Sequence, residues 1–137
     1  MAHAKFRAEV LTPEGQLFND EVEMISTRTA VGSIGILARH APVLAMLEPT
    51  ELRLYTSESD VARFAQAEGY MQVTADDVIL LVEEAHSPSE LDAGQLRDRL
   101  QQAERELQDA GDDTERRRVA ERDKRRLETF LRIAEGG

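Results

Sequence analysis

The apolar residues change their spacing near residue 85, and this change divides the chain into two parts of different secondary structure. Before that point they form short runs between turn signals, and Phe6, Ala8 and Val10 alternate with polar residues as on one face of a strand. After that point they recur every three or four residues, as on one face of a helix. The chain is therefore predicted to be mainly β with a smaller α part.

Several apolar runs with no helical stretch between them make up residues 1–86. They lie at 22–25, 32–37, 52–55, 61–74 and 78–82. Strands at this spacing predict an antiparallel β-sandwich, with a barrel as the alternative. The last run is long enough for a strand with two buried faces.

A two-helix hairpin is predicted for residues 87–137. Leu96, Leu100, Ala103 and Leu107 mark one face of a first helix, and residues 87–92 offer several N-cap candidates.

The break at 111–113 precedes a second helix, with Asp112 and Glu115 at capping-box spacing. Its narrower apolar stripe contains Ala120, Leu127, Leu131 and Ala134. Narrow stripes give little packing energy, so the hairpin is expected to be marginally stable and able to detach.

Charge and composition exclude several classes of function. A net charge of −10 disfavours broad binding to nucleic-acid backbones or anionic membranes. The absence of cysteine excludes disulfides and thiolate metal sites, and fits a reducing compartment. No signal-peptide h-region and no membrane-spanning apolar stretch is present in these residues. Membrane association is therefore expected only through partners, and no cofactor is predicted.

The second helix is basic within an acidic chain. Residues 90–113 carry three Arg against eight Asp and Glu, a net of −5, whereas residues 114–137 carry eight Arg and Lys against five acids, a net of +3. One interpretation is a solvated face with ion pairs to Glu121 and Glu128. The other is a docking surface for an acidic partner.

The chain's histidines and paired glycines have structural interpretations that outweigh chemical ones. His3, His40 and His86 are scattered without ligand-spaced companions, so no metal site is predicted. The cluster of Glu83, Glu84 and His86 is better explained as a strand end than as acid–base chemistry. Gly32 and Gly35 lack the Gly-Lys-Ser/Thr end of a phosphate loop and are interpreted as turn glycines.

Three segments, 10–15, 22–27 and 32–47, resemble the epsilon subunit of bacterial F-type ATP synthases. The third reads Gly-Ser-Ile-Gly-Ile-Leu-Ala-Arg-His-Ala-Pro-Val-Leu-Ala-Met-Leu and is similar to the family's Gly-x-x-Gly-Ile-Leu-Pro-Gly-His-x-Pro signature. The chain departs from the family at Ala38-Arg39, where the family has Pro-Gly, at Thr50, and at Glu68-Gly69. Because only Gly takes positive φ at low cost, these changes affect loop geometry.

The resemblance implies a non-catalytic rotor subunit at the cytoplasmic face of the cell membrane. In the family, the sandwich binds the gamma subunit and sits on the c-ring, which points to His40 and Ser33 as contacts. The helices can extend into the catalytic hexamer, where basic residues meet an acidic segment of the beta subunits and block ATP hydrolysis. The matching residues here are Arg116, Arg117, Arg118, Arg122, Arg125 and Arg126.

Some family members bind ATP between the hairpin helices through an Ile/Leu-Asp-x-x-Arg motif. Here the matching residues are 91–95, with Gln95 in place of the arginine and Gly94 weakening the first helical turn by about 1 kcal/mol. Weak or absent ATP binding is therefore predicted, and Asp92 is expected to be a helix cap. The remaining candidates for ATP contacts are Asp92, Arg99, Arg122 and Arg126.

Two other functions compete with the rotor interpretation. One is a free-standing sandwich-plus-hairpin adaptor for an acidic protein, which would form no stable gamma complex. The other is a small enzyme built on the Glu83, Glu84 and His86 cluster, which has neither a nucleophile nor a metal constellation.

Overall fold

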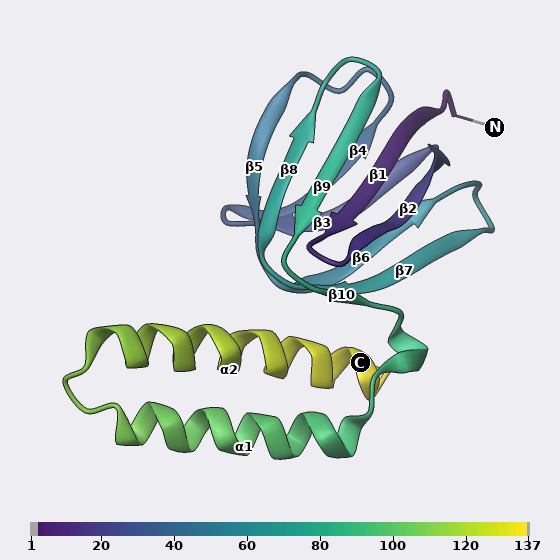
Figure 1. The fold of residues 1–137 in the computed structure, drawn as a ribbon. Coiled ribbons are helices and arrows are strands. Elements are labelled where there is room, and N and C mark those ends of the chain that lie inside the picture. Colours follow the sequence, from purple (N-terminus) through teal and green to yellow (C-terminus); the bar gives the residue numbers. More distant parts are fainter. Residues whose placement is uncertain (1–2, 137) are drawn as a thin grey trace. The chain divides into compact units, whose positions relative to one another are not determined.

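The computed structural model describes residues 3–136, which form two compact units with the boundary between His86 and Ser87. The first is a β-sandwich and the second is a pair of helices (Figure 1). The predicted order of a sandwich followed by a helical hairpin is confirmed. Each unit is described separately below.

The sandwich contains ten strands. They are β1 (Phe6–Thr12), β2 (Gly15–Val22), β3 (Met24–Thr29), β4 (Gly32–Leu37), β5 (Val43–Leu47), β6 (Thr50–Tyr55), β7 (Val61–Gln66), β8 (Gly69–Val73), β9 (Asp77–Val82) and β10 (Ala85–His86).

The strands pair in the order β10-β7-β6-β3-β5-β8-β9-β1-β2, and β4 pairs with β3. In Figure 1, β5, β8, β9, β1 and β2 form one layer and β4, β3, β6 and β7 form the other. One pairing departs from the predicted antiparallel sheet: β1 and β9 run parallel, from Arg7 opposite Asp77 to Leu11 opposite Leu81. Strand pattern reveals which residues face the core but not which strand lies alongside, so this pairing was not predictable from the sequence.

The core of the sandwich lies between the two layers. Phe6, Ala8 and Val10 are buried, as their alternation predicts. The run at 78–82 does not have the predicted two buried faces, because Leu81 is half exposed while Val78, Leu80 and Val82 are buried. The rest of the buried cluster comprises Val22, Ile25, Ile36, Leu47, Leu52, Leu54, Met71 and Val73.

Gln66, at the end of β7, is a fully buried polar side chain with three hydrogen bonds. Its Oε1 accepts from the Thr27 hydroxyl at 2.7 Å, and its Nε2 donates to the carbonyls of Glu48 and Ala67, each at 3.0 Å. The amide therefore joins β3, β7 and the turn between β5 and β6. Such a buried group is tolerated because its polar atoms are satisfied.

Two positions show how backbone geometry constrains the sequence. Arg39 has φ 64°, so a residue with a Cβ occupies a left-handed position that favours glycine. At Gly69, by contrast, a Cβ would collide with the backbone of Leu81 and Val82 on the paired strand β9. The first position carries strain and the second requires glycine.

The second unit contains a short 3₁₀ turn, η1 (Pro88–Glu90), and two helices, α1 (Ala93–Asp109) and α2 (Thr114–Ala134). Asp92 caps α1 as predicted, since its carboxylate accepts from the Gln95 N–H at 3.1 Å. The predicted cap of α2 at Asp112 is wrong by one residue: Asp113 accepts from the Arg116 N–H at 3.1 Å. Two adjacent aspartates have equal capping chemistry, so the sequence alone does not select between them.

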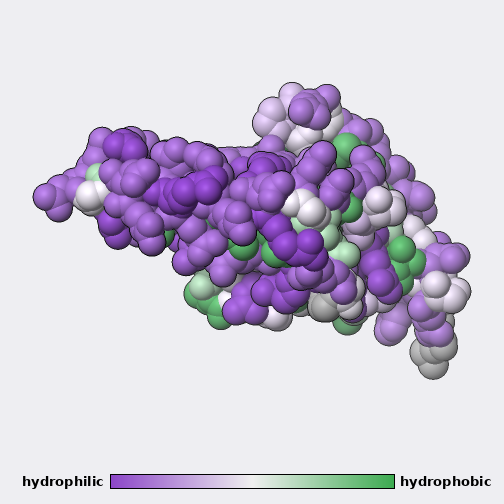
Figure 2. All heavy atoms as spheres, turned by 90° about the horizontal axis from the view of Figure 1, so that it is seen from below, coloured by the Kyte–Doolittle hydropathy of each residue, from purple (hydrophilic) through white to green (hydrophobic). Residues whose placement is uncertain are grey.

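The helices pack through few large apolar residues. Leu96 and Ala103 of α1, and Ala120, Leu127, Phe130 and Ile133 of α2, are buried. Hydrophilic residues predominate over the hairpin in Figure 2, which agrees with the narrow apolar stripes in its sequence.

Candidate functional site

The outer face of β1, β5, β8 and β9 carries apolar side chains exposed to solvent. Leu44 is 70% exposed, Met46 62%, and Tyr70 and Leu81 51% each. With the half-buried Leu11 and Ile79, they form what we term the apolar face: Leu11, Leu44, Met46, Tyr70, Ile79 and Leu81.

The strand register gathers these residues on one surface. Met46 lies opposite Tyr70, Tyr70 opposite Leu81, and Leu81 opposite Leu11, so one row crosses four strands. Directly opposed residues of a sheet share a face, so this row is continuous. Contiguous exposed apolar surface is uncommon on monomeric proteins and marks an interaction site.

A groove of about 330 Å³ lies at one end of the apolar face. Its walls include Leu11, Pro13, Tyr70 and Leu81, and Gly69 contributes no side chain to it. The groove extends the apolar face into a concave surface, which suits the anchor side chain of a protein partner.

The apolar face was not predicted from the sequence. Leu44 and Met46 alternate with inward-facing Val43, Ala45 and Leu47, so the segment reads as one uninterrupted apolar run. The sequence did contain one signal, because the inward-facing and the outward-facing residues of this strand are both apolar.

The two predicted rotor-contact residues in the signature segment are not brought together. Ser33 is exposed near the start of β4, whereas His40 follows the turn after its end. Ser33 and Leu37 are four residue steps apart along the strand, which is about 13 Å. His40 is held at the far end, where its N–H donates to the Leu37 carbonyl at 3.2 Å and its Nδ1 lies 2.7 Å from the Ala41 carbonyl oxygen.

Near Ser33, the tip of the β3–β4 turn presents a further apolar side chain. Val31 is 98% exposed, and its N–H donates to the Thr29 hydroxyl at 3.2 Å. The same hydroxyl donates to the Gly32 carbonyl, so the turn is fixed by local hydrogen bonds. Sequence reasoning had given Val31 no role.

Most of the predicted beta-subunit contacts in α2 are paired with acids of the same hairpin. Arg117 lies 3.6 Å from Glu121, one of the two partners that the solvated-face interpretation predicts. Arg118 donates two hydrogen bonds to Glu115, at 2.6 and 3.1 Å, and Arg122 lies 3.0 Å from Asp123.

Among these ion pairs, only that of Arg116 joins the two helices, since Arg116 lies 3.6 Å from Glu106 of α1. Arg125 is exposed, and Arg126 lies in the wall of a pocket.

The Arg118 guanidinium lowers the pKa of the Glu115 carboxyl, first through the hydrogen bonds and then through their charges. A second such cluster lies in the sandwich, where hydrogen bonds to Glu51 and then to Tyr55 raise the pKa of Arg53. Both clusters are surface ion pairs, and neither pKa shift indicates a group that transfers a proton in catalysis.

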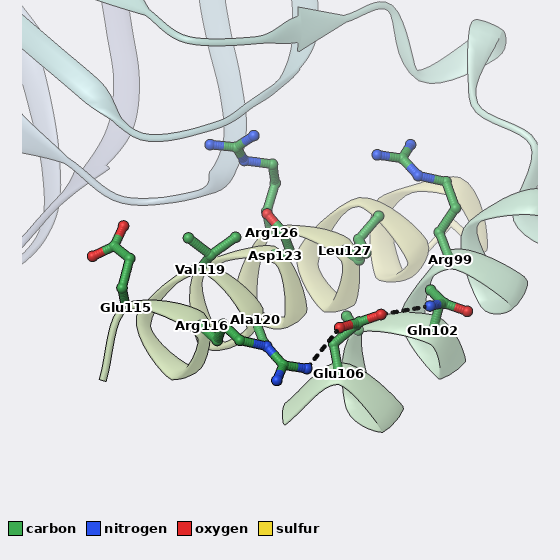
Figure 3. Close-up of a pocket in the computed structure, with 11 residues that line it drawn as sticks. Arg99, Gln102, Glu106, Glu115, Arg116, Val119, Ala120, Asp123, Arg126 and Leu127 are labelled. Atoms are coloured by element: carbon green, nitrogen blue, oxygen red, sulfur yellow. Dashed lines mark hydrogen bonds and ion pairs between the residues drawn. The ribbon is translucent and has the colours of Figure 1, made fainter. Parts of the chain in front are cut away.

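A pocket of about 520 Å³ lies between α1 and α2 (Figure 3). Ala103, Val119, Ala120 and Leu127 supply its apolar lining. Its polar rim is made of Arg99, Gln102, Glu106, Glu115, Arg116, Asp123 and Arg126.

Only two of the four candidates for ATP contacts reach this pocket. Arg99 and Arg126 line it, and in the view of Figure 3 their guanidinium groups extend the same way. Asp92 is used as the cap of α1, and Arg122 is paired with Asp123. Three acids share the rim with the arginines, so the pocket is no simple anion site.

The cluster at the end of the sandwich contains a local side-chain contact. His86 Nε2 lies 2.7 Å from Glu84 Oε1, and His86 belongs to β10, which pairs with β7. Across residues 3–136, no three His, Cys, Asp or Glu side chains are grouped as metal ligands, and no helix is long and apolar enough to span a membrane.

Comparison with known proteins agrees with these features. Residues 5–88 match the family described as ATP synthase, Delta/Epsilon chain, beta-sandwich domain. The ATP synthase epsilon chain of Halalkalibacterium halodurans is 35% identical over 125 residues, covering 91% of this chain and 93% of that one. The epsilon chain of Persephonella marina is 38% identical over 127 residues, covering 92% and 93%.

Solved structures share the fold at lower identity. A chain of the Euglena gracilis mitochondrial ATP synthase, solved as OSCP/F1/c-ring, matches with a TM-score of 0.78 and 23% identity, covering 97% of this chain and 81% of that one. A chain of the Tetrahymena thermophila enzyme, solved as central stalk/c-ring, matches with a TM-score of 0.69 and 19% identity, covering 98% and 99%. The resemblance inferred from residues 10–15, 22–27 and 32–47 is thus confirmed. The chain belongs to the ATP synthase delta/epsilon family, and its relatives over nearly its whole length are bacterial epsilon chains.

Proposed function

We propose that this chain is a non-catalytic rotor subunit of an F1Fo ATP synthase, which couples proton translocation to ATP synthesis and restrains ATP hydrolysis. The observation that supports this most directly is the apolar face, an unpartnered surface on a sheet whose other side is a complete core. Such a surface suits a permanent subunit contact more than a transient one. Its relatives are epsilon chains, and its structural neighbours come from central-stalk and c-ring assemblies.

The sandwich is the part that fastens the subunit to the rotor. The gamma subunit covers the apolar face, and Ser33 and His40, at opposite ends of β4, contact gamma or the c-ring. Val31 extends the Ser33 end of this contact with an exposed apolar side chain. The six residues of the apolar face are uncharged, and Glu9, which lies opposite Ile79, accepts a hydrogen bond from Gln16 at 3.1 Å, so gamma would bury the six without an unpaired charge among them.

The hairpin is the regulatory part. Its basic second helix faces an acidic segment of the beta subunits through Arg116, Arg117, Arg118, Arg122, Arg125 and Arg126. The protein is peripheral to the membrane, on its cytoplasmic face, as a component of F1.

The docking proposal is tested by placing one lysine on the apolar face. Met46→Lys should abolish co-purification with gamma, because a desolvated unpaired ammonium at the interface is strongly unfavourable. The matched control is Leu17→Lys, which adds the same charge at an exposed leucine on β2, a strand that contributes no residue to the apolar face or to the Ser33 and His40 contacts. A gamma complex that survives Met46→Lys would exclude this face as the docking surface. If the wild-type chain itself forms no stable gamma complex, the adaptor interpretation replaces the rotor role.

The regulatory proposal is tested by deleting residues 88–137. Since the sandwich has its own core, the truncated chain should still assemble while ATP hydrolysis by the reconstituted enzyme rises. Unchanged hydrolysis with normal assembly would show that the hairpin is not inhibitory.

A further inference from the structure

Two ion pairs join the hairpin helices, one at each end. Near the free ends of the hairpin, Arg97 of α1 lies 2.9 Å from Glu135, the C-cap of α2. Near the turn, Glu106 of α1 lies 3.6 Å from Arg116 of α2. In Figure 3, Glu106 is seen between Arg116 and Gln102, whose amide donates to it at 2.9 Å. Both pairs must break if the helices separate.

The other ion pairs of α2 behave differently when the helices separate. Arg117 with Glu121, Arg118 with Glu115, and Arg122 with Asp123 are each contained within α2. They persist whether or not α1 lies alongside. Of the four α2 ion pairs described here, only that of Arg116 reaches α1 and must break when the hairpin opens.

The overall charge of the two helices favours the closed arrangement. The segment containing α1 has a net charge of −5 and the segment containing α2 has +3. Helix α1 itself has a net charge of only −1, because Glu90, Asp92, Asp112 and Asp113 lie outside it. The overall charge therefore favours closure weakly, and the individual ion pairs between the helices supply the specific attraction.

We propose that Glu106 acts as an internal substitute for the acidic partner of α2: it binds Arg116 while the hairpin is closed, and Arg116 becomes available to an acidic protein segment only when the helices separate. Closing the hairpin and docking α2 on a partner then compete for the same guanidinium. Docking of Arg116 stabilises the open hairpin, and the Glu106 contact stabilises the closed one. The effect on partner docking rests on the proposed regulatory role of the hairpin. The effect of the Glu106–Arg116 contact on hairpin closure concerns the isolated chain.

The expected effect is modest because both partners are about half exposed. Exposed pairs typically shift an equilibrium by about 1.5- to 5-fold, and added salt screens them. Glu106→Gln should therefore raise the ratio of open to closed hairpin by about 2- to 5-fold at low ionic strength. The difference from the wild type should vanish in high salt.

The control is Glu121→Gln, which removes the same charge from an exposed ion pair of similar geometry contained within α2. The chain has no cysteine, so a pair of labels is introduced by Gln101→Cys and Glu128→Cys, at exposed positions on α1 and α2. The distance distribution between the labels, measured on the full chain, gives the open fraction. Glu106→Gln should raise this fraction and Glu121→Gln should leave it at the wild-type value.

Equal open fractions in the two variants would overturn the inference, since the interhelical pair would then have no special role. A second variant separates closure from docking: Glu106→Arg combined with Arg116→Glu restores the ion pair with reversed sign. The reversed pair should restore the closed fraction. If it does not, the effect of Glu106→Gln is not the loss of an ion pair, and the inference fails.

The reconstituted enzyme tests the competition itself. Glu106→Gln should lower ATP hydrolysis by about the factor by which it opens the hairpin, whereas the reversed pair should relieve inhibition because Arg116 is gone. If the label distances change as expected but ATP hydrolysis responds to neither variant, the proposed competition is refuted. The proposed binding of the sandwich to gamma would not be affected by that result.

Discussion

The buried amide of Gln66 offers a quantitative test of what holds the sandwich together. Gln66→Leu replaces the amide with an apolar side chain that is one methylene shorter and removes its three hydrogen bonds, to Thr27, Glu48 and Ala67. At about 1 kcal/mol net for each bond, the direct loss is roughly 3 kcal/mol. The Thr27 hydroxyl is left buried without this partner at a cost of about 1–3 kcal/mol, and the added apolar side chain returns about 1–2 kcal/mol.

The expected result is therefore a decrease of about 3–4 kcal/mol in the free energy of unfolding of the sandwich. Thr27→Val should cost about 2 kcal/mol, because it removes one bond and strands Gln66 Oε1. In the double variant, Gln66→Leu with Thr27→Val, neither polar atom of this hydrogen bond is left buried without its partner. The cost of the double variant should therefore be about 1–2 kcal/mol smaller than the sum of the two single costs.

Urea unfolding followed by tyrosine fluorescence measures these changes in the sandwich alone. Tyr55 and Tyr70 are the two tyrosines of the chain, both lie in the sandwich, and there is no tryptophan. The m-value should stay constant, so that a shift in midpoint reports stability. Additive costs within about 0.5 kcal/mol, or a loss below about 1 kcal/mol for Gln66→Leu, would refute the proposed coupling between β3 and β7.

Three further predictions concern single positions. Gly69→Ala should destabilise the sandwich by about 2–3 kcal/mol in the same urea assay, because its Cβ meets the backbone of β9, whereas Gly35→Ala, with no atom within 4 Å of its Cβ, should be near neutral. Arg39→Gly should stabilise it by about 0.5–1 kcal/mol, since relief of the left-handed strain exceeds the added chain entropy; a loss would show that the arginine side chain has a stabilising contact. The pKa of Glu115, measured by NMR titration, should lie below its ordinary value and return toward it in Arg118→Ala. Because the folded-state pKa is lowered, the contribution of this pair is present above the unfolded-state pKa and is lost as pH falls through the folded-state value.

Local patterns predicted the elements because they depend on neighbours in the sequence. Alternation at Phe6, Ala8 and Val10 fixed the inward face of β1, and the spacing of Leu96 and Ala103 fixed that of α1. The parallel pairing of β1 with β9 was missed because no local signal specifies a distant strand. Even so, the order of elements and three short segments, 10–15, 22–27 and 32–47, sufficed to identify the family.

Interaction sites were harder to predict because they depend on register between elements. Tyr70 and Met46 are far apart in sequence, and only the pairing of β5 with β8 places them on one face. The contact of Glu106 with Arg116 likewise depends on how two helices align. The sequence does not distinguish Arg116 from the other basic residues of α2. The structure does, because the carboxylate partner of Arg116, Glu106, belongs to α1.

The parallel pairing of β1 with β9 also bears on how the protein is made. The first strand can pair with β2 early, but its other neighbour, β9, ends at Val82, so the sandwich cannot be completed until residue 82 has been synthesised and has left the ribosome. During that interval the future core strands and the apolar face are exposed together on a nascent chain. The hairpin residues follow in sequence and remain in or behind the exit tunnel while this happens. Without the hairpin residues, the sandwich would no longer stay attached to the ribosome while it completes its fold. A gene shortened in this way should therefore yield less soluble protein per chain synthesised than the stability of the sandwich alone suggests.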